Sequence, residues 1–165
     1  MKIKSYSNAE VDSCRKAGKI TATILDELNS IIKEGISTSE IDEFCLTRIQ
    51  ELGGTPAPLF YRGFPKSTCI SVNHVVCHGI PGDKILDEGD ILNIDITVIL
   101  DGWYGDTSRM YFVGEPSKKA KFLTKITYEC LWLGIETVKP GSTTGDIGHA
   151  IQMLSLIHIS EPTRH

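Results

Sequence analysis

The chain has 165 residues, carries a formal net charge of −4 and is 41% apolar. This length favours one domain with a core of its own, and the slight acidity argues against a nucleic-acid-binding protein. No apolar run is long enough to cross a bilayer, and the start Met1-Lys2-Ile3-Lys4-Ser5 lacks the apolar core of a signal peptide.

The cysteines show no CxxC spacing, and their number is odd. Without a secretion signal, such a set favours free thiols in a reducing compartment. We therefore expect a soluble, cytoplasmic protein with no membrane segment and no recognition of nucleic-acid sequence. The five cysteines are Cys14, Cys45, Cys69, Cys77 and Cys130.

Two helices are predicted near the start of the chain, each preceded by a capping box. The box Ser7–Glu10 begins the first helix, whose apolar spacing extends to Ile32 and whose end is expected at Gly35. The box Ser37–Glu40 begins the second helix, which is expected to reach Gly53.

A loop rich in proline and aromatic residues follows at 55–66, and short strands are expected at Thr68–Val72 and His74–Cys77. Residues 90–113 have the pattern of a β-hairpin. Its two-residue turn is predicted at Asp101-Gly102, which lies between two runs rich in β-forming residues.

Two further helices are predicted after the hairpin. Ser117 caps the first, which ends near Pro140, and the second begins near Thr144. The segment Gly35–Ile41 resembles Gly141–Ile147, because in both a capped helix follows a glycine. This weak repeat favours a two-lobed fold whose second lobe has only begun where the chain ends.

The first strand of the hairpin has one apolar and one polar face. Counting outward from the turn places Thr97 opposite Asp106, so that Asp95 and Asp106 become diagonal neighbours on the polar face. Such neighbours have α-carbons about 7–8 Å apart. Two carboxylates at this range repel each other unless a cation lies between them, so the pair predicts a divalent metal site.

The simpler alternative is that these aspartates are solvated turn or edge residues. It suits Asp95 poorly because apolar residues flank it on both sides, and it leaves Asp106 open when that residue is considered alone. The aspartates interpreted as solvated turn residues are Asp83, Asp87, Asp90 and Asp101.

Cys77 and His78 have the residue types of a nucleophile and its base. Adjacent residues of a strand point to opposite faces, which argues against a direct pair. His78 ends the expected strand beside Gly79 and is a candidate for projecting into a cleft, although a single histidine is more often structural.

Four segments together resemble the type I methionine aminopeptidases, and the resemblance extends from Met1 to Met153. It implies the pita-bread fold, an α/β (α+β) architecture of two pseudo-symmetric lobes, of which this chain holds the first and the start of the second. The segments are Phe64–Cys69, Val75–Pro81, Gly89–Asp95 and Gly102–Ser108.

The resemblance also implies a site with two divalent metal ions, whether cobalt, manganese, iron or zinc. Asp95 would bind one ion and Asp106 would bridge both, while His78 would contact the substrate and polarise the scissile amide. The residues implied to line the pocket for the methionine side chain are Tyr61, Phe64 and Cys69.

Further metal ligands of that family, one histidine and two glutamates of the second lobe, have no match here. His149 lies too early and is expected on the surface. The tail 154–165 resembles a translated sequencing adapter, so the catalytic domain is expected at 1–153, incomplete and inactive as written.

The implied reaction is metal-assisted hydrolysis of the first peptide bond of nascent polypeptides that begin with methionine. The ribosome is a further candidate partner, and the full-length protein is expected to be a monomer. Two alternatives stay open, a non-catalytic binding module on the same fold and a prolidase-type Xaa-Pro peptidase. The pair Asp95 and Asp106 argues against the first, and the stretch Cys77–Pro81 against the second.

Overall fold

A computed structural model describes residues 4–160 of the chain. The expectations for Met1–Ile3 and for tail residues 161–165 lie outside the described residues. The chain divides into two compact units, Met1–Pro116 and Ser117–His165, each of which is described by itself. Within residues 4–160, no helix combines the length and the hydropathy of a membrane span.

Two helices of the first unit begin where the capping boxes predicted. In helix α1 (Asn8–Glu27) and helix α2 (Thr38–Glu51), the cap serine and the glutamate three residues later bond to each other's backbone N–H. Helix α1 ends earlier than expected, and a short 3₁₀ turn, η1 (Leu28–Ser30), follows it. The side chains of Asn29 and Ser30 donate to the carbonyl oxygens of Asp26 and Glu27, which closes the helix there.

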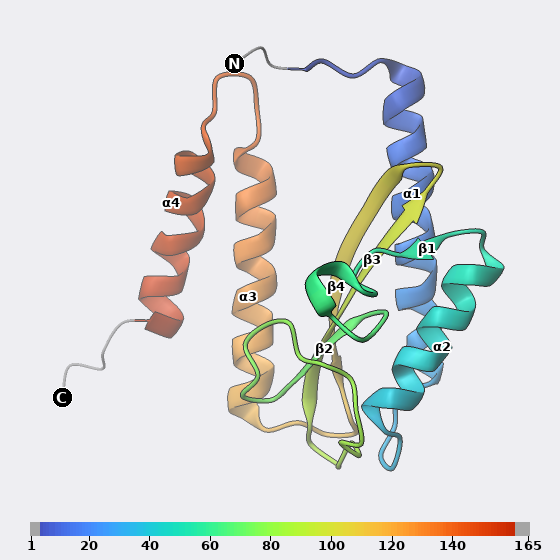
Figure 1. Cartoon of the computed structure of the whole chain (residues 1–165). Coiled ribbons are helices and arrows are strands. Elements are labelled where there is room, and N and C mark those ends of the chain that lie inside the picture. Colours follow the sequence, from blue (N-terminus) through green and yellow to red (C-terminus); the bar gives the residue numbers. More distant parts are fainter. Residues whose placement is uncertain (1–3, 161–165) are drawn as a thin grey trace. The chain divides into compact units, whose positions relative to one another are not determined.

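A four-stranded antiparallel sheet forms the other layer of this unit (Figure 1). Strand β3 (Ile91–Leu100) pairs with β4 (Trp103–Phe112), and also with β2 (Cys69–Val72) and the two-residue β1 (Thr55–Pro56). The hairpin prediction is confirmed, because Leu100 pairs with Trp103. Asp101 and Gly102 both have positive φ, as a type I′ turn requires.

The prediction of a strand at His74–Cys77 is wrong, because these residues form no strand. Asn73 takes a left-handed φ of 52°, and Val75 donates to the carbonyl oxygen of Val72, so the chain turns away from the sheet. The Asn73 side chain holds this turn, since it donates to the Asp90 carboxylate at 2.7 Å and accepts from the N–H of Ile91.

Asp90 is therefore a buried structural residue, and its interpretation as a solvated turn residue is wrong. Its carboxylate also accepts from the N–H of Asp87 and forms an ion pair with Lys84 at 3.3 Å. The other three aspartates of that group are exposed, as expected: Asp83, Asp87 and Asp101.

The core of the first unit lies between the sheet and the two helices. The inward side chains of β3 alternate with the polar ones, as the sequence predicted, and helix α1 crosses β4 in direct backbone contact at Gly105. The hydroxyl of Tyr111 also donates to the Leu25 carbonyl at 2.6 Å. The fully buried large side chains include Ile24, Leu25, Leu28, Ile41, Ile49, Leu92, Ile94, Ile96 and Val98.

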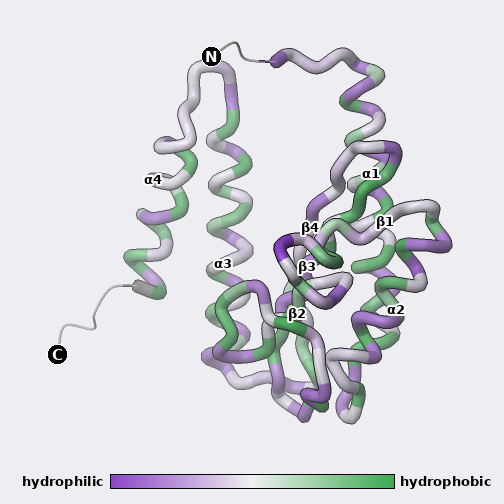
Figure 2. Tube along the Cα trace, viewed as in Figure 1, coloured by the Kyte–Doolittle hydropathy of each residue, from purple (hydrophilic) through white to green (hydrophobic). Residues whose placement is uncertain are grey.

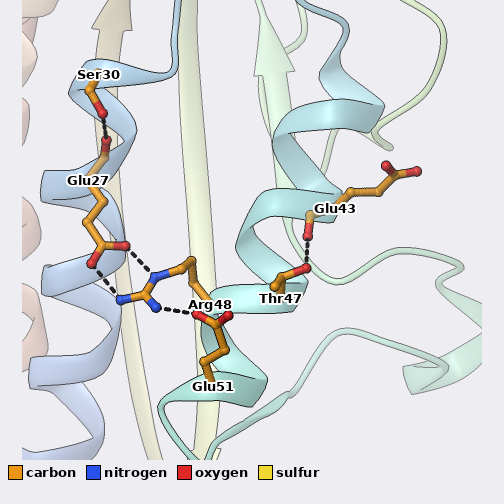
Figure 3. A network of polar contacts seen from close by, with 6 residues as sticks. All are labelled: Glu27, Ser30, Glu43, Thr47, Arg48 and Glu51. Carbon is orange, nitrogen blue, oxygen red and sulfur yellow. Dashed lines mark hydrogen bonds and ion pairs between the residues drawn. The ribbon is translucent and has the colours of Figure 1, made fainter.

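An ion-pair network joins the end of α1 to α2 (Figure 3). The guanidinium of Arg48 donates to both carboxylate oxygens of Glu27, at 2.7 and 2.8 Å, and it also pairs with Glu51. The hydrogen bond from Arg48 lowers the pKa of Glu27 below its ordinary value. This planar, two-point contact orients the helices better than a single bond would.

The second unit consists of helices α3 (Lys118–Thr137) and α4 (Thr144–Ser155) and a π-helical turn, η3 (Leu156–Ser160). Ser117 caps α3 as predicted, and α4 begins at the predicted Thr144, with Thr143 as its cap. Hydrophobic and hydrophilic residues alternate along both helices (Figure 2). Gly134 of α3 lies against Ile151 of α4, and His149 is exposed, as expected. That residues 154–165 are a foreign tail stays a prediction.

Candidate metal and peptide site

The polar face of the β3–β4 hairpin carries the two candidate metal ligands. Thr97 lies opposite Asp106 and Asp95 lies opposite Ser108, so the two aspartates occupy diagonal positions on one face. The residues paired with the two aspartates on this face are Thr97 and Ser108, which have small side chains. The predicted register is confirmed, and no large side chain separates the carboxyl groups.

The two carboxyl groups interact with each other. Burial raises the pKa of Asp95 most, and repulsion by Asp106 together with a hydrogen bond between the two side chains raises it further, while His78 lowers it. Asp95 is half-buried and Asp106 is exposed. Such a pair is stabilised when a proton or a cation lies between its oxygens.

Cys69 of β2 pairs with Asp95 of β3, and β2 flanks the edge of β3 that does not pair with β4 at this position. Burial, and then the nearby Asp95 carboxylate, raise the pKa of its thiol to about 11. The thiol is therefore neutral at physiological pH, which suits an apolar lining better than a nucleophile or a thiolate ligand.

Asp42 positions the segment that leads into Cys69, and the sequence interpretation did not identify it. The buried carboxylate of Asp42 in α2 accepts from the N–H groups of Ser67 and Thr68 at 3.0 and 2.8 Å, and from the Thr68 hydroxyl at 2.7 Å. A signal was present, because Asp42 continues the spacing of the buried Thr38, Cys45 and Ile49.

His78 lies in the loop between β2 and β3 and has a left-handed φ of 54°. Gly79 fixes this loop against β2, since Ile70 donates to its carbonyl at 2.8 Å and its N–H donates to the Ser71 hydroxyl. A Cβ at position 79 would lie 2.1 Å from the Ile70 carbonyl oxygen, so only glycine fits. The loop thus presents an exposed His78 to the pocket without the strand that the sequence had indicated.

One open pocket of about 910 Å³ in the first unit brings the candidate residues together. Its floor is the hairpin face, and one wall is the segment 57–65. All six residues singled out from the sequence line it: Tyr61, Phe64, Cys69, His78, Asp95 and Asp106. It is also lined by residues that the sequence interpretation did not single out, among them Arg62, Ile80, Thr97 and Tyr104.

The donor set suits a hard divalent cation but is incomplete. Within residues 4–160, no group of three or more histidine, cysteine or acidic side chains is placed to hold a metal ion. Asp95 and Asp106 contribute carboxylate oxygens, the ligand type that such ions prefer, whereas each ion takes about six ligands. Two carboxylates alone would therefore fill only part of the shell of such an ion.

A bound divalent ion can activate water for hydrolysis, so two carboxylates on adjacent strands at the floor of a pocket fit a metal-dependent hydrolase. Residues 12–155 match metallopeptidase family M24, and the chain belongs to this family. It is 51% identical over 158 residues to the methionine aminopeptidase of Rickettsia prowazekii. The matched region covers 96% of this chain and 61% of that relative. The chain is 46% identical over 154 residues to the methionine aminopeptidase of Escherichia coli K12, covering 92% and 58%.

Solved structures agree with this assignment. The crystal structure of the Rickettsia prowazekii methionine aminopeptidase matches with a TM-score of 0.93 at 50% identity, covering 95% of this chain and 63% of that one. A Bacillus anthracis Xaa-Pro dipeptidase matches with a TM-score of 0.82 at 21% identity, which shows a shared fold alone. The predicted pita-bread fold is confirmed, and the chain spans about 60% of the length of its curated relatives.

Proposed function

We propose that this chain forms part of a metal-dependent aminopeptidase that removes the N-terminal methionine from polypeptides. The observation that carries the proposal is the carboxylate pair Asp95 and Asp106 at the floor of a pocket whose wall is aromatic, apolar and sulfur-containing. The 46–51% identity to methionine aminopeptidases supports it.

In this proposal Asp95 and Asp106 hold two divalent ions, supplied as cobalt, manganese, iron or zinc, together with ligands from outside these 165 residues. The metal, when bound, supplies Lewis-acid polarisation of the scissile carbonyl and lowers the pKa of water. The ring of His78, at the pocket edge, contacts the substrate and polarises the scissile amide.

The pocket wall selects the side chain to be removed. Tyr61, Phe64 and the neutral thiol of Cys69 surround a space in which a flexible thioether makes favourable contacts with sulfur and aromatic rings. This lining favours methionine over the proline-directed specificity of the more distant structural neighbours. The presence of both carboxylates argues against a binding module without catalysis.

The partners and the compartment follow from the same proposal. The substrate is the methionine end of a nascent polypeptide, the ribosome is a candidate docking partner, and the complete protein acts as a monomer. The free thiols of Cys14 and Cys77, which are exposed, fit a reducing compartment such as the cytoplasm.

The test compares peptides on a protein in which this chain is continued to the length of its relatives. We expect methionine release from Met-Ala-Ser with added cobalt or manganese, no cleavage of Ala-Pro-Ser, and loss of release in Asp106→Ala. The exposed turn variant Asp101→Asn is the control and keeps the activity, because asparagine also tolerates the positive φ of this turn. Cleavage of the proline peptide alone would replace the proposal with the prolidase-type function, and binding without cleavage would replace it with the binding module.

A further inference from the structure

Residues 58–64 form an arch closed by backbone hydrogen bonds at the pocket wall. The N–H of Phe60 donates to the carbonyl of Phe64 at 2.8 Å, that of Tyr61 donates to Pro58 at 2.9 Å, and that of Phe64 donates to Tyr61 at 3.0 Å. Inside this closed set of bonds, Phe60 and Arg62 have φ values of 65° and 48°. Left-handed backbone at non-glycine residues is disfavoured, and it is concentrated at functional sites where the surroundings enforce it.

Arg62 belongs to the arch and places a cation on the pocket wall. Its side chain is exposed, it lines the pocket, and its guanidinium carbon lies 5.4 Å from the centroid of the Tyr61 ring. Among the described residues, no carboxylate forms an ion pair with Arg62. The stacking contact with Tyr61 restrains the side chain without neutralising its charge.

The charges that line the pocket are unevenly placed. Asp95 and Asp106 lie together on the hairpin floor, where the proposed function assigns them to metal, and Arg62 lies on the 58–64 arch. A peptide whose methionine side chain occupies the wall near Tyr61 would continue from there past the rim. The residues that follow the methionine would therefore pass within the field of an unpaired guanidinium.

We propose that Arg62 is a specificity-determining residue that favours polypeptides carrying a carboxylate shortly after the N-terminal methionine. This inference rests on the proposed function, because it takes the pocket wall as the site of the methionine side chain. An exposed ion pair of this kind changes affinity by about two- to fivefold, and salt weakens it.

The test measures equilibrium binding to the metal-free 165-residue chain, so the readout does not depend on hydrolysis. The probes are two amidated, C-terminally labelled peptides, Met-Ala-Asp-Ser and Met-Ala-Asn-Ser, followed by fluorescence anisotropy at low salt. We expect the acidic peptide to bind about two- to fivefold more tightly, and Arg62→Gln to abolish this preference. Arg62→Lys should retain part of it, because the charge stays while the planar stacking is lost.

Arg15→Gln is the matched control, since Arg15 is an exposed arginine of α1 that pairs with Asp12 and is absent from the pocket lining. This variant should keep the full preference. Equal binding of the two peptides, no binding of either, or a preference that survives Arg62→Gln would each overturn the assignment. Failure of the extended protein to release methionine would refute the proposed function, while the binding ratio would still decide the role of Arg62.

Discussion

Single residues determine how closely the backbone segments of the first unit can approach one another. Gly105 of β4 lies under α1, where an added Cβ would come within 2.3 Å of the carbonyl carbon of Ala17. Gly79 holds the His78 loop against β2 by a similar approach. Both glycines therefore stabilise the elements from which the pocket is built, although neither lines it.

Replacing Gly105 with alanine should destabilise the protein by about 1–3 kcal/mol, because the methyl group would force α1 away from the sheet. The control is Gly18→Ala on the opposing helix, where an added Cβ meets nothing within 4 Å. That change should be neutral or stabilise the protein by up to about 1 kcal/mol, since alanine favours helix. Urea unfolding followed by circular dichroism measures both, and equal effects of the two variants would contradict the close approach at Gly105.

The residues of the candidate site differ in how far they could be predicted. Asp95 and Asp106 followed from strand alternation and a two-residue turn, which are local rules, and the structure confirms their register. The loop position of His78 depends on Asn73 bonding to Asp90 and Ile91, 17 and 18 residues away, which no local pattern encodes. Arg62 had no sequence signal at all.

At the scale of elements, the starts of helices were easier to predict than their ends. Capping boxes are reciprocal bonds within four residues, so Ser7 and Ser37 marked the starts of α1 and α2. The apolar spacing continued to Ile32, whereas α1 itself ends at Glu27. The end of α1 is held by side-chain hydrogen bonds from Asn29 and Ser30. It is also held by the ion pair between Glu27 and Arg48, which are 21 residues apart in the sequence.

The contact between α1 and α2 should depend on pH through Glu27. Because Arg48 lowers the pKa of Glu27 in the folded state, its carboxylate contributes stability above its ordinary pKa of 4.5. This contribution is lost as the pH falls through the lower folded-state pKa. Glu27→Gln should therefore lower the Tm by a few degrees at pH 7 and by less at pH 3.

Thermal unfolding at several pH values and at low salt measures this difference. The exposed Glu43→Gln variant of α2 serves as the control and should show no such pH dependence. A penalty for Glu27→Gln that is the same at pH 7 and pH 3 would show that the contact acts by packing rather than by charge.

At the scale of the whole molecule, the described chain combines a well-packed first unit with a second unit rich in exposed apolar side chains. On α3 these include Tyr128, Leu131 and Ile135, which are 59%, 54% and 48% exposed. Exposed apolar patches favour association. We expect the isolated 165-residue chain to self-associate at micromolar concentration, which sedimentation velocity measures, and a monodisperse monomer would contradict this expectation.

In the proposed function, Asp95 and Asp106 form the metal-binding floor of a peptidase pocket. Titration of the 165-residue chain with manganese, followed by electron paramagnetic resonance of the free ion, tests it most directly. We expect weak binding that is lost in both Asp95→Asn and Asp106→Asn and kept in Asp101→Asn, with no methionine released from Met-Ala-Ser. Binding that survives both substitutions, or steady methionine release by this chain alone, would contradict it.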